Sequence, residues 1–266
     1  MSPDVVHNVI AATCDPVSNL KLAVHPLSRC PCQFDCLLAT AAASFIPLLP
    51  ITGLPMSEEA ADGAVASYRA ARTRAFAYPR EADLVHGLEL AALGAVLTGV
   101  AAQVSIPLPF TPVPITLQTF AVLLTGVTLG ARFGGASQAL YVGLGAGGVP
   151  WFEGFGAGVG ALAGPTGGYL VGFPVAAVLA GAAVDRYPVT RRLPVLLVVL
   201  GLANAVVFAF GLPWLYTWLT VINGDPLSLP ELANKGLIPF IPGGIMKTVG
   251  AALVATAFLP GPSERS

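Results

Sequence analysis

The stretch LVHGLELAALGAVLTGVAAQVSIPLPFTPVPITLQTFAVLLTG, residues 84–126, decides the fold. Residues 84–105 are apolar over a length that crosses a bilayer core, which needs roughly 20 residues of helix. Four prolines then follow close together: Pro107, Pro109, Pro112 and Pro114. Proline breaks helices, lacks a backbone donor and pushes the preceding residue out of the helical region. Residues 105–114, named here the proline elbow, are therefore predicted to be an extended connection between two membrane helices.

The composition places the chain in a membrane. Of its 266 residues, 55% are hydrophobic and only 10% are charged, and the mean hydropathy is +0.76. A soluble domain carries about 25% charged residues, so a soluble enzyme is a poor alternative. The 30 glycines and 24 prolines are compatible with membrane helices, which tolerate both residues better than soluble helices do. The net charge of −1 argues against nucleic acid as a partner.

The apolar segments predict an all-α fold, a polytopic membrane bundle of six transmembrane helices. The expected spans are 84–105, 115–130, 132–149, 166–185, 193–222 and 240–259. The second and third spans are shorter than a bilayer core requires, and the tight turn LGARFGG joins them. The fifth span is long enough to tilt in the bilayer or to bend at Pro213.

The positively charged residues test this number of spans. With six spans, nine arginines lie in the segments on one side: Arg69, Arg72, Arg74, Arg80, Arg132, Arg186, Arg191, Arg192 and Arg265. The segments on the other side hold only Lys235. Positive residues collect on the cytosolic side of membrane proteins, so both termini are predicted to be cytosolic. An odd number of spans would destroy this asymmetry.

Residues 1–80 form an N-terminal extension of the six-helix domain, which is assigned to residues 81–266. The extension has no sustained period, and three interpretations fit it: a largely disordered tail, a targeting segment, or a misassigned start with Met56 as the true one. An apolar island at 36–55 is interrupted by prolines. All four cysteines lie in the extension: Cys14, Cys30, Cys32 and Cys36. Because no fourth ligand has the usual spacing, no metal site is expected.

The proline elbow is apolar as well as extended, since it contains Ile106, Leu108, Phe110 and Val113. An apolar segment at the mouth of a helical bundle is expected to fold over something instead of extending into water. A lid is one interpretation. A plain interhelical turn is the alternative, and composition alone does not separate the two.

Three stretches decide between these interpretations: FTPVPITLQTFAVLLTG at 110–126, GPTGGYLVGF at 164–173 and GLIPFIPGGIMK at 236–247. Together with the six-span layout, they resemble BioY, the biotin-binding membrane subunit of energy-coupling factor (ECF) transporters, over residues 84–259. The resemblance implies biotin uptake as the substrate-binding (S) component, with a transmembrane coupling (T) component and ATP-binding cassette ATPases as partners. It implies no enzyme activity and no cofactor in this chain, because ATP is used by the partner ATPases.

The resemblance also implies a biotin cavity near the outer face. Lys247 is the single basic residue inside a predicted span, and an ionisable group at membrane depth is a functional candidate. Snorkelling to the interface is the alternative, but Lys247 lies about 10 Å along its helix at 1.5 Å per residue. The GPTGG turn places Thr166, Gly167 and Tyr169 at a helix N-terminus, which attracts anions. Close packing of small residues between helices is the alternative for this turn.

Other candidate contacts have open alternatives. BioY proteins usually carry an aspartate shortly before this lysine, whereas this chain has Gly244 there, so the ligand's identity stays open. Glu153 is a candidate replacement for that acid. The remaining predicted substrate contacts are Phe110, Gln118 and Trp214. Trp214 belongs to an aromatic cluster that is more typical of an interfacial belt, and Gln118 and Asn204 fit a bond to a neighbouring helix equally well.

A stripe of small residues occupies one face of the first span, at Ala91, Ala95 and Gly99. In membrane subunits of this transporter class, such an Ala-x-x-x-Ala face docks on the coupling component, so the resemblance implies a partner interface here. Packing within the chain fits the spacing equally well.

Other functions stay open at this point. An S component of the same architecture for another vitamin-like ligand fits Gly244, and a solitary biotin transporter needs no partner. An intramembrane enzyme needs a catalytic constellation, yet away from their end residues the spans hold only Glu89 and Lys247, with His86 at the edge. A purely structural protein would not need both the elbow and Lys247. The motif GLGAGG at 143–148 lacks the strand, helix and acid of a dinucleotide site.

The expected location is the cell membrane, and the N-terminal extension leaves a plastid envelope open.

Overall fold

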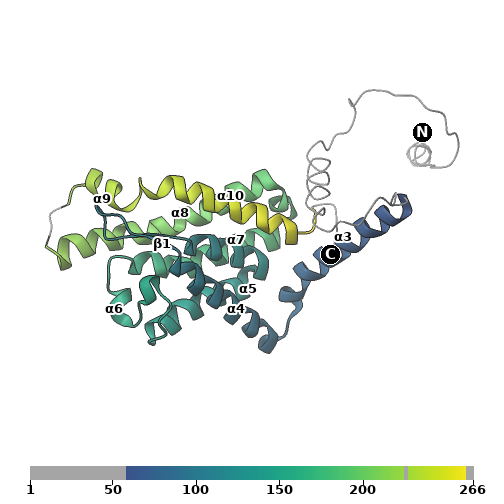
Figure 1. Cartoon of the computed structure of the whole chain (residues 1–266), viewed down its shortest axis with the longest axis horizontal. Coiled ribbons are helices and arrows are strands. Elements are labelled where there is room, and N and C mark those ends of the chain that lie inside the picture. The colour runs from purple at the N-terminus through teal and green to yellow at the C-terminus, as the bar shows by residue number, and fades with distance from the viewer. Residues whose placement is uncertain (1–57, 225–226, 262–266) are drawn as a thin grey trace, which may run out of the picture. The chain divides into compact units, whose positions relative to one another are not determined.

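A computed structural model describes residues 58–224 and 227–261 (Figure 1). The predictions for the cysteines and the apolar island lie outside the described residues. The long helices are α3 (Glu58–Glu81), α4 (Leu84–Gln103), α5 (Gln118–Ala146), α7 (Gly167–Arg186), α8 (Leu193–Thr217) and α10 (Phe240–Phe258). The short elements are β1 (Ser105–Ile106), β2 (Ile115–Thr116), η1 (Glu153–Phe155), α6 (Val159–Leu162), η2 (Pro188–Arg191), η3 (Trp218–Ile222) and α9 (Leu229–Gly236). The predicted all-α class is confirmed.

The predicted spans agree with the helices, with one difference. Within the described residues, 5 helices are long and apolar enough to cross a membrane: α4, α5, α7, α8 with its continuation η3, and α10. The predicted second and third spans, 115–130 and 132–149, are joined in α5. Because the backbone leaves the helical region at Gly130, α5 consists of two helices that meet there, which agrees with the two separate helical segments that were predicted. The number of bilayer crossings stays a prediction.

Helix α5 is a hairpin of two arms. The backbone of Gly130 leaves the helical region, with φ 78° and ψ 178°, which glycine adopts without a Cβ clash. At the open end, Gln118 Nε2 donates to the Tyr141 hydroxyl at 2.6 Å. Near the turn, a Cβ on Gly134 would lie 2.8 Å from the Cα of Gly126. Residues this far apart in sequence can meet only if the arms run antiparallel.

An ion pair closes the turn of this hairpin. Asp185 at the end of α7 accepts from the backbone N–H of Ala131, at the start of the second arm, at 2.9 Å. Arg80 on α3 donates to the Asp185 carboxylate at 2.7 Å. Arg80 also donates to the carbonyl oxygens of Val127 and Thr128, which end the first arm. The pair thus satisfies backbone groups that a broken helix leaves without partners. Burial lowers the pKa of Arg80, and the Asp185 carboxylate opposes this shift.

Arg80→Ala is expected to lower the free energy of unfolding by about 3 kcal/mol, the lower end of the range for breaking a buried ion pair. The lower end applies because the two side chains are 18% and 31% exposed. Thermal unfolding of the detergent-solubilised protein, followed by circular dichroism, measures the effect. Arg192→Ala is the control, since Arg192 is exposed at the same end of the bundle. An equal loss in both variants would contradict the proposed capping of the turn.

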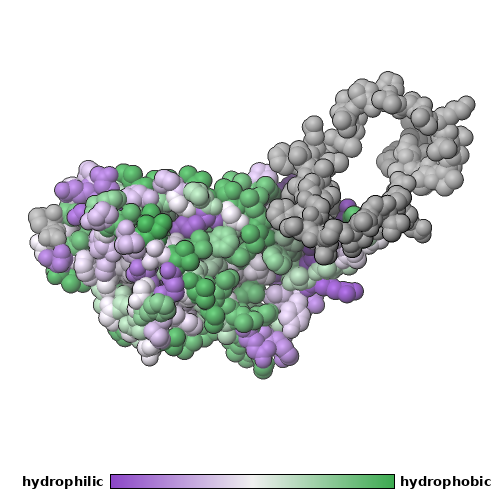
Figure 2. All heavy atoms as spheres, in the orientation of Figure 1, coloured by the Kyte–Doolittle hydropathy of each residue, from purple (hydrophilic) through white to green (hydrophobic). Residues whose placement is uncertain are grey.

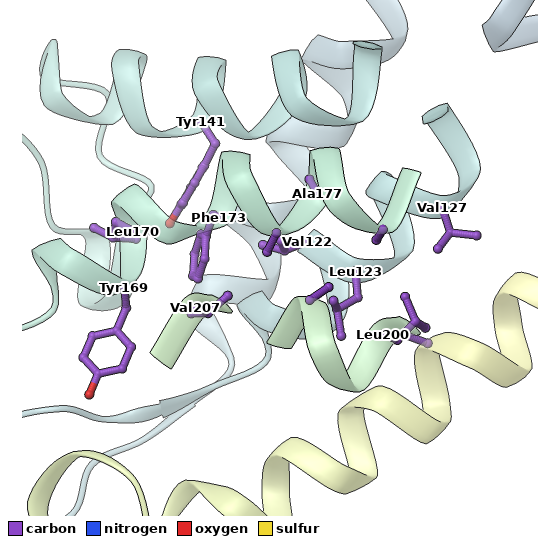
Figure 3. Packing of buried hydrophobic residues seen from close by; sticks show 14 of the residues in the cluster. Val122, Leu123, Val127, Tyr141, Tyr169, Leu170, Phe173, Ala177, Leu200 and Val207 are labelled. Atoms are coloured by element: carbon purple, nitrogen blue, oxygen red, sulfur yellow. The ribbon is translucent and has the colours of Figure 1, made fainter. Parts of the chain in front are cut away.

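Helix α7 lies at the centre of the bundle and packs against α5 and α8. The buried face of α7 carries the large residue Phe173 and four small residues, Gly172, Ala176, Ala177 and Ala180. The α5 and α8 side chains that surround it include Val122, Leu123, Tyr141, Leu200 and Val207 (Figure 3). Small residues let helix backbones approach closely, which is how helices associate in lipid.

The outer surface of the bundle is apolar. Exposed apolar side chains on α4, α8 and α10 include Leu93, Val100, Val198, Leu202, Ile245 and Leu253. Figure 2 shows hydrophobic residues over the middle of the bundle and hydrophilic ones toward its two ends. A surface of this kind is stable against lipid and not against water. The chain is therefore an integral, multi-pass membrane protein.

The bundle has two different ends (Figure 1). The elbow end contains β1, β2, α6 and α9. The α3 end contains the turn of α5, η2, the end of α10, and α3. Here Phe76 of α3 is buried, and Arg72 donates to the carbonyl oxygen of Leu259. Helix α3 therefore contacts the bundle, and the domain boundary expected at residue 80 stays a prediction.

Candidate functional site

The proline elbow is extended, as predicted, and folds over the end of the bundle. Strands β1 and β2, at its two ends, pair antiparallel. Thr111 Oγ1 donates to the carbonyl oxygen of Lys235 on α9 at 2.6 Å, and Val113 is buried in the core. These contacts agree with a lid. Phe110, predicted to line the site, is 56% exposed, whereas Thr111 and Val113 are buried. A contact of Phe110 with the ligand stays a prediction.

Lys247 lies within the elbow end and not in solvent. Its Nζ donates to the carbonyl oxygen of Thr116 in β2 at 3.0 Å, and the residue is partly buried. The spans that the structure describes contain two carboxylates, Glu89 and Asp185, and both lie toward the α3 end. The amine therefore has a neutral carbonyl as its partner. A charge held this way in an apolar region is costly unless an anion joins it.

A chain of hydrogen bonds runs from β2 into the core. Thr116 Oγ1 donates to Gln118 Oε1 at 2.7 Å, and Gln118 Nε2 donates to the Tyr141 hydroxyl at 2.6 Å. The Tyr141 hydroxyl donates to the carbonyl oxygen of Trp151 at 3.3 Å. Gln118 thus bonds within the chain, which was the alternative to a ligand contact. The network holds β2 against α5 and so positions the carbonyl that Lys247 contacts.

Gly244 is buried on α10, on the same face as Lys247 and about one turn before it. A Cβ at Gly244 would lie 3.1 Å from Asn204 Nδ2 on α8. Asn204 is partly buried, and its amide has no hydrogen-bond partner in the described part of the chain. The structure therefore brings together a lysine, an amide and the glycine that stands where an acid was expected.

The GPTGG turn is tightly packed. A Cβ on Gly167 would lie 1.7 Å from the carbonyl oxygen of Leu162, and one on Gly168 would lie 2.3 Å from Trp214 Cβ. Trp214 Nε1 donates to the carbonyl oxygen of Gly164 at 2.8 Å. Both glycines thus serve close packing, the alternative that the sequence left open. Contacts of Gly167 and Trp214 with a ligand stay predictions.

The Tyr169 hydroxyl donates to the carbonyl oxygen of Gly236 at 2.9 Å. Since Thr111 binds the preceding carbonyl, the last turn of α9 is held by both the elbow and α7. Helix α9 therefore closes the elbow end together with the proline elbow. Thr166 stands just before α7 and makes no side-chain cap. Roles for Thr166 and Tyr169 in ligand binding stay predictions.

Glu153 is tied to the elbow. It accepts from Ser105 Oγ at 3.1 Å, and Ser105 lies opposite Thr116 in the two-stranded ribbon. Among the described residues, Glu153 and Lys247 are connected through this ribbon and form no salt bridge with each other. A contact of Glu153 with the ligand stays a prediction.

The stripe on α4 lies inside the chain. Ala91 is 0% exposed and Ala95 1% exposed. A Cβ on Gly99 would lie 3.1 Å from Trp151 Cβ. This packing favours the alternative of an internal contact, and the partner interface on these residues stays a prediction.

Sequence reasoning missed several residues that build this end. Thr111, Thr116 and Tyr141 have no local signal, because each acts through a partner far away in sequence. Helix α9 did have a signal: Ser228 and Glu231 form a capping box, with Pro230 in the first turn. That pattern would have predicted a helix after the fifth span.

Comparisons with known proteins agree with this architecture. Residues 72–261 match the BioY family. The chain belongs to the BioY family. Among relatives, the probable biotin transporter BioY of Methanothermobacter thermautotrophicus is 43% identical over 138 residues, which cover 52% of this chain and 88% of that protein. The biotin transporter BioY of Thermotoga maritima is 36% identical over 157 residues, covering 59% and 85%.

A solved structure is also similar to this BioY-family chain. It is a crystal structure of the S-component for biotin from an ECF-type ABC transporter, with a TM-score of 0.57 and 26% identity. The match covers 65% of this chain and 89% of the other. These similarities confirm the predicted transporter class and argue against an intramembrane enzyme.

Proposed function

We propose that this BioY-family chain takes up biotin as the substrate-binding S component of an ECF-type transporter, with the biotin carboxylate on Lys247. The relatives and the similar solved structure carry biotin in their names, which supports this ligand. The observation that supports the position is the Lys247 amine, held at the elbow end by one neutral carbonyl.

Charge explains why an anionic ligand suits this position. Biotin has a carboxylate on a flexible tail and a neutral ureido head. A carboxylate that replaces the Thr116 carbonyl as the partner of Lys247 places a full negative charge beside the ammonium, whereas the carbonyl offers only a dipole. The ligand thus supplies the negative charge that the described spans lack near Lys247.

Entry of the ligand requires local opening of the elbow end. The proline elbow and α9 are held there by the Thr111, Tyr169 and Lys247 bonds, each to a backbone carbonyl. The two hydroxyl bonds contribute about 0.5–1.5 kcal/mol each and the bond from the Lys247 ammonium about 1.5–3 kcal/mol, so exchange for ligand contacts is feasible. The elbow and α9 then act as the lid over bound biotin.

Energy for transport comes from partners in this proposal. These are a T component and a pair of ATP-binding cassette ATPases in the cell membrane, with ATP bound by the ATPases alone. A solitary transporter remains the alternative. Uptake by membranes that contain only this chain separates the two.

Equilibrium binding of radiolabelled biotin to the purified protein tests the ligand. Unlabelled biotin is expected to displace the label best, desthiobiotin less well, and unrelated vitamins not at all. Displacement by another vitamin at lower concentration would favour the alternative of an S component for a different ligand, which Gly244 keeps open.

Gly244→Asp is expected to tighten biotin binding about tenfold, because a carboxylate there can accept hydrogen bonds from the ureido N–H groups. One such bond to a charged group contributes about 1.5–3 kcal/mol, and about 1.4 kcal/mol already changes the affinity tenfold. The new carboxylate would lie beside Asn204, whose Nδ2 can orient it. Gly244→Asn is the matched control, since it has the same shape without the charge. Weaker binding in both variants would mean that the space at Gly244 is needed for the ligand.

A further inference from the structure

Two adjoining cavities lie at the α3 end, far from the proline elbow. The first has a volume of about 700 Å³ and lies between α3, the first part of α4, the turn of α5 and the end of α10. Most of its lining is apolar, including Phe76, Pro79, Leu90, Leu129, Phe258 and Leu259. The second, of about 370 Å³, shares Phe76, Pro79 and Leu129 with the first. Both volumes fall in the range of small-molecule sites, about 300–1,000 Å³.

The second cavity carries excess positive charge. Its lining includes Arg80, Arg132, Arg191 and Asp185. Asp185 is paired with Arg80, and neither Arg132 nor Arg191 forms a salt bridge within the described residues. Arg132 is exposed, while Arg191 is partly buried with its guanidinium 4.3 Å from the centre of the Phe76 ring. Three guanidinium groups and one carboxylate give this lining a net charge of +2 beside an apolar cavity.

The apolar cavity is continuous with the lipid-facing surface. Phe258, which lines it, is 46% exposed, and Val254 one turn earlier on α10 is 40% exposed. Leu90 lines it from α4, where Leu88 is also exposed. The cavity thus lies where the apolar helices end, the depth at which acyl chains meet headgroups.

We propose that the two cavities bind one anionic phospholipid, with an acyl chain in the apolar cavity and the phosphate between Arg132 and Arg191. The phosphate of a zwitterionic lipid is offset by the lipid's own cation, so such a lipid would leave the net positive charge of the cavity uncompensated, and a free phosphate would leave the apolar cavity unfilled. The bound lipid links α3 to the turn of α5 and to the end of α10, so it holds α3 on the bundle.

Thermal unfolding of the full-length protein in a neutral detergent tests the proposal. Phosphatidylglycerol, phosphatidylcholine and inorganic phosphate are added at equal concentration. Phosphatidylglycerol is expected to raise the Tm by about 5 °C near saturation. Phosphatidylcholine and inorganic phosphate are expected to raise it by less than about 2 °C. Native mass spectrometry, which counts retained lipid directly, gives a readout that does not depend on stability.

Variants localise the effect. Arg191→Gln is expected to weaken retention of phosphatidylglycerol about tenfold, the loss of one charge-assisted contact, and Arg132→Gln should weaken it further. Ala77→Phe narrows the apolar cavity and should also reduce retention. Arg192→Gln is the control, because Arg192 is exposed at the same end and lines neither cavity.

Two results would overturn the proposal. One is equal stabilisation by phosphatidylcholine or by inorganic phosphate. The other is unchanged retention when Arg132 and Arg191 are both replaced by glutamine. If the glutamine variants unfold in detergent, Arg132→Lys with Arg191→Lys replaces them. This pair keeps the charge and should keep the preference for phosphatidylglycerol, and loss of that preference would also overturn the proposal.

Discussion

Lys247→Ala is expected to weaken biotin binding about a hundredfold, because truncating one partner of a desolvated charge pair costs 2–5 kcal/mol, and about 2.7 kcal/mol is a hundredfold. Without the amine, the biotin carboxylate would enter an apolar end that offers no other positive group on the described spans. The Thr116 carbonyl would also lose its donor, which loosens β2. Equilibrium binding of radiolabelled biotin measures the effect.

Lys235→Ala is the matched control for this variant. Lys235 also lies at the elbow end, but it contacts the elbow through its backbone carbonyl and not through its side chain. Its replacement should leave biotin affinity within about twofold, as for most surface substitutions. Unaltered affinity in Lys247→Ala would remove the amine from the site, and equal losses in the two variants would point to general damage of the elbow end.

Gly134→Leu should lower the free energy of unfolding by about 3 kcal/mol or more, the upper range for overpacking. A Cβ at Gly134 would meet the Gly126 Cα at 2.8 Å and the Thr125 carbonyl oxygen at 2.9 Å. Both obstacles are backbone atoms, so no side-chain rotation relieves the clash, and the arms of α5 must separate. For a domain of this size the Tm should fall by about 10 °C.

Gly143→Leu in the second arm of α5 is the control. Gly143 is exposed, and a Cβ there would meet nothing within 4 Å. Because leucine also has a higher helix propensity than glycine, this variant should be as stable as the parent or more stable. A similar loss in Gly134→Leu and Gly143→Leu would mean that the arms of α5 do not pack as the structure has them.

Much of the architecture could be predicted from residue properties that act locally. Apolar runs located the four spans outside α5 because transfer into lipid depends on composition over about one helix length. The four prolines predicted an extended elbow, since covalent geometry alone excludes a helix there. Lys247 stood out because an amine at membrane depth is costly wherever its neighbours lie.

Other features depend on which residues meet through space. Glycine at 130 permits a sharp turn, but a turn of the chain also needs the Arg80–Asp185 pair to satisfy the exposed backbone groups, and Asp185 lies 105 residues after Arg80. The stripe of Ala91, Ala95 and Gly99 fits an internal and an external surface equally well. Only packing of α4 against α5 and Trp151 places it inside.

The sequence by itself determined that this chain is a helical membrane protein with an extended proline elbow and a single amine within its spans, because hydropathy, proline geometry and charge burial act on each segment alone. The tertiary structure decided the partners of that amine. Lys247 meets a carbonyl 131 residues away, and Gly244 faces Asn204 on another helix. Helical periodicity predicts which side chains share a face, whereas the packing of whole helices selects what that face touches.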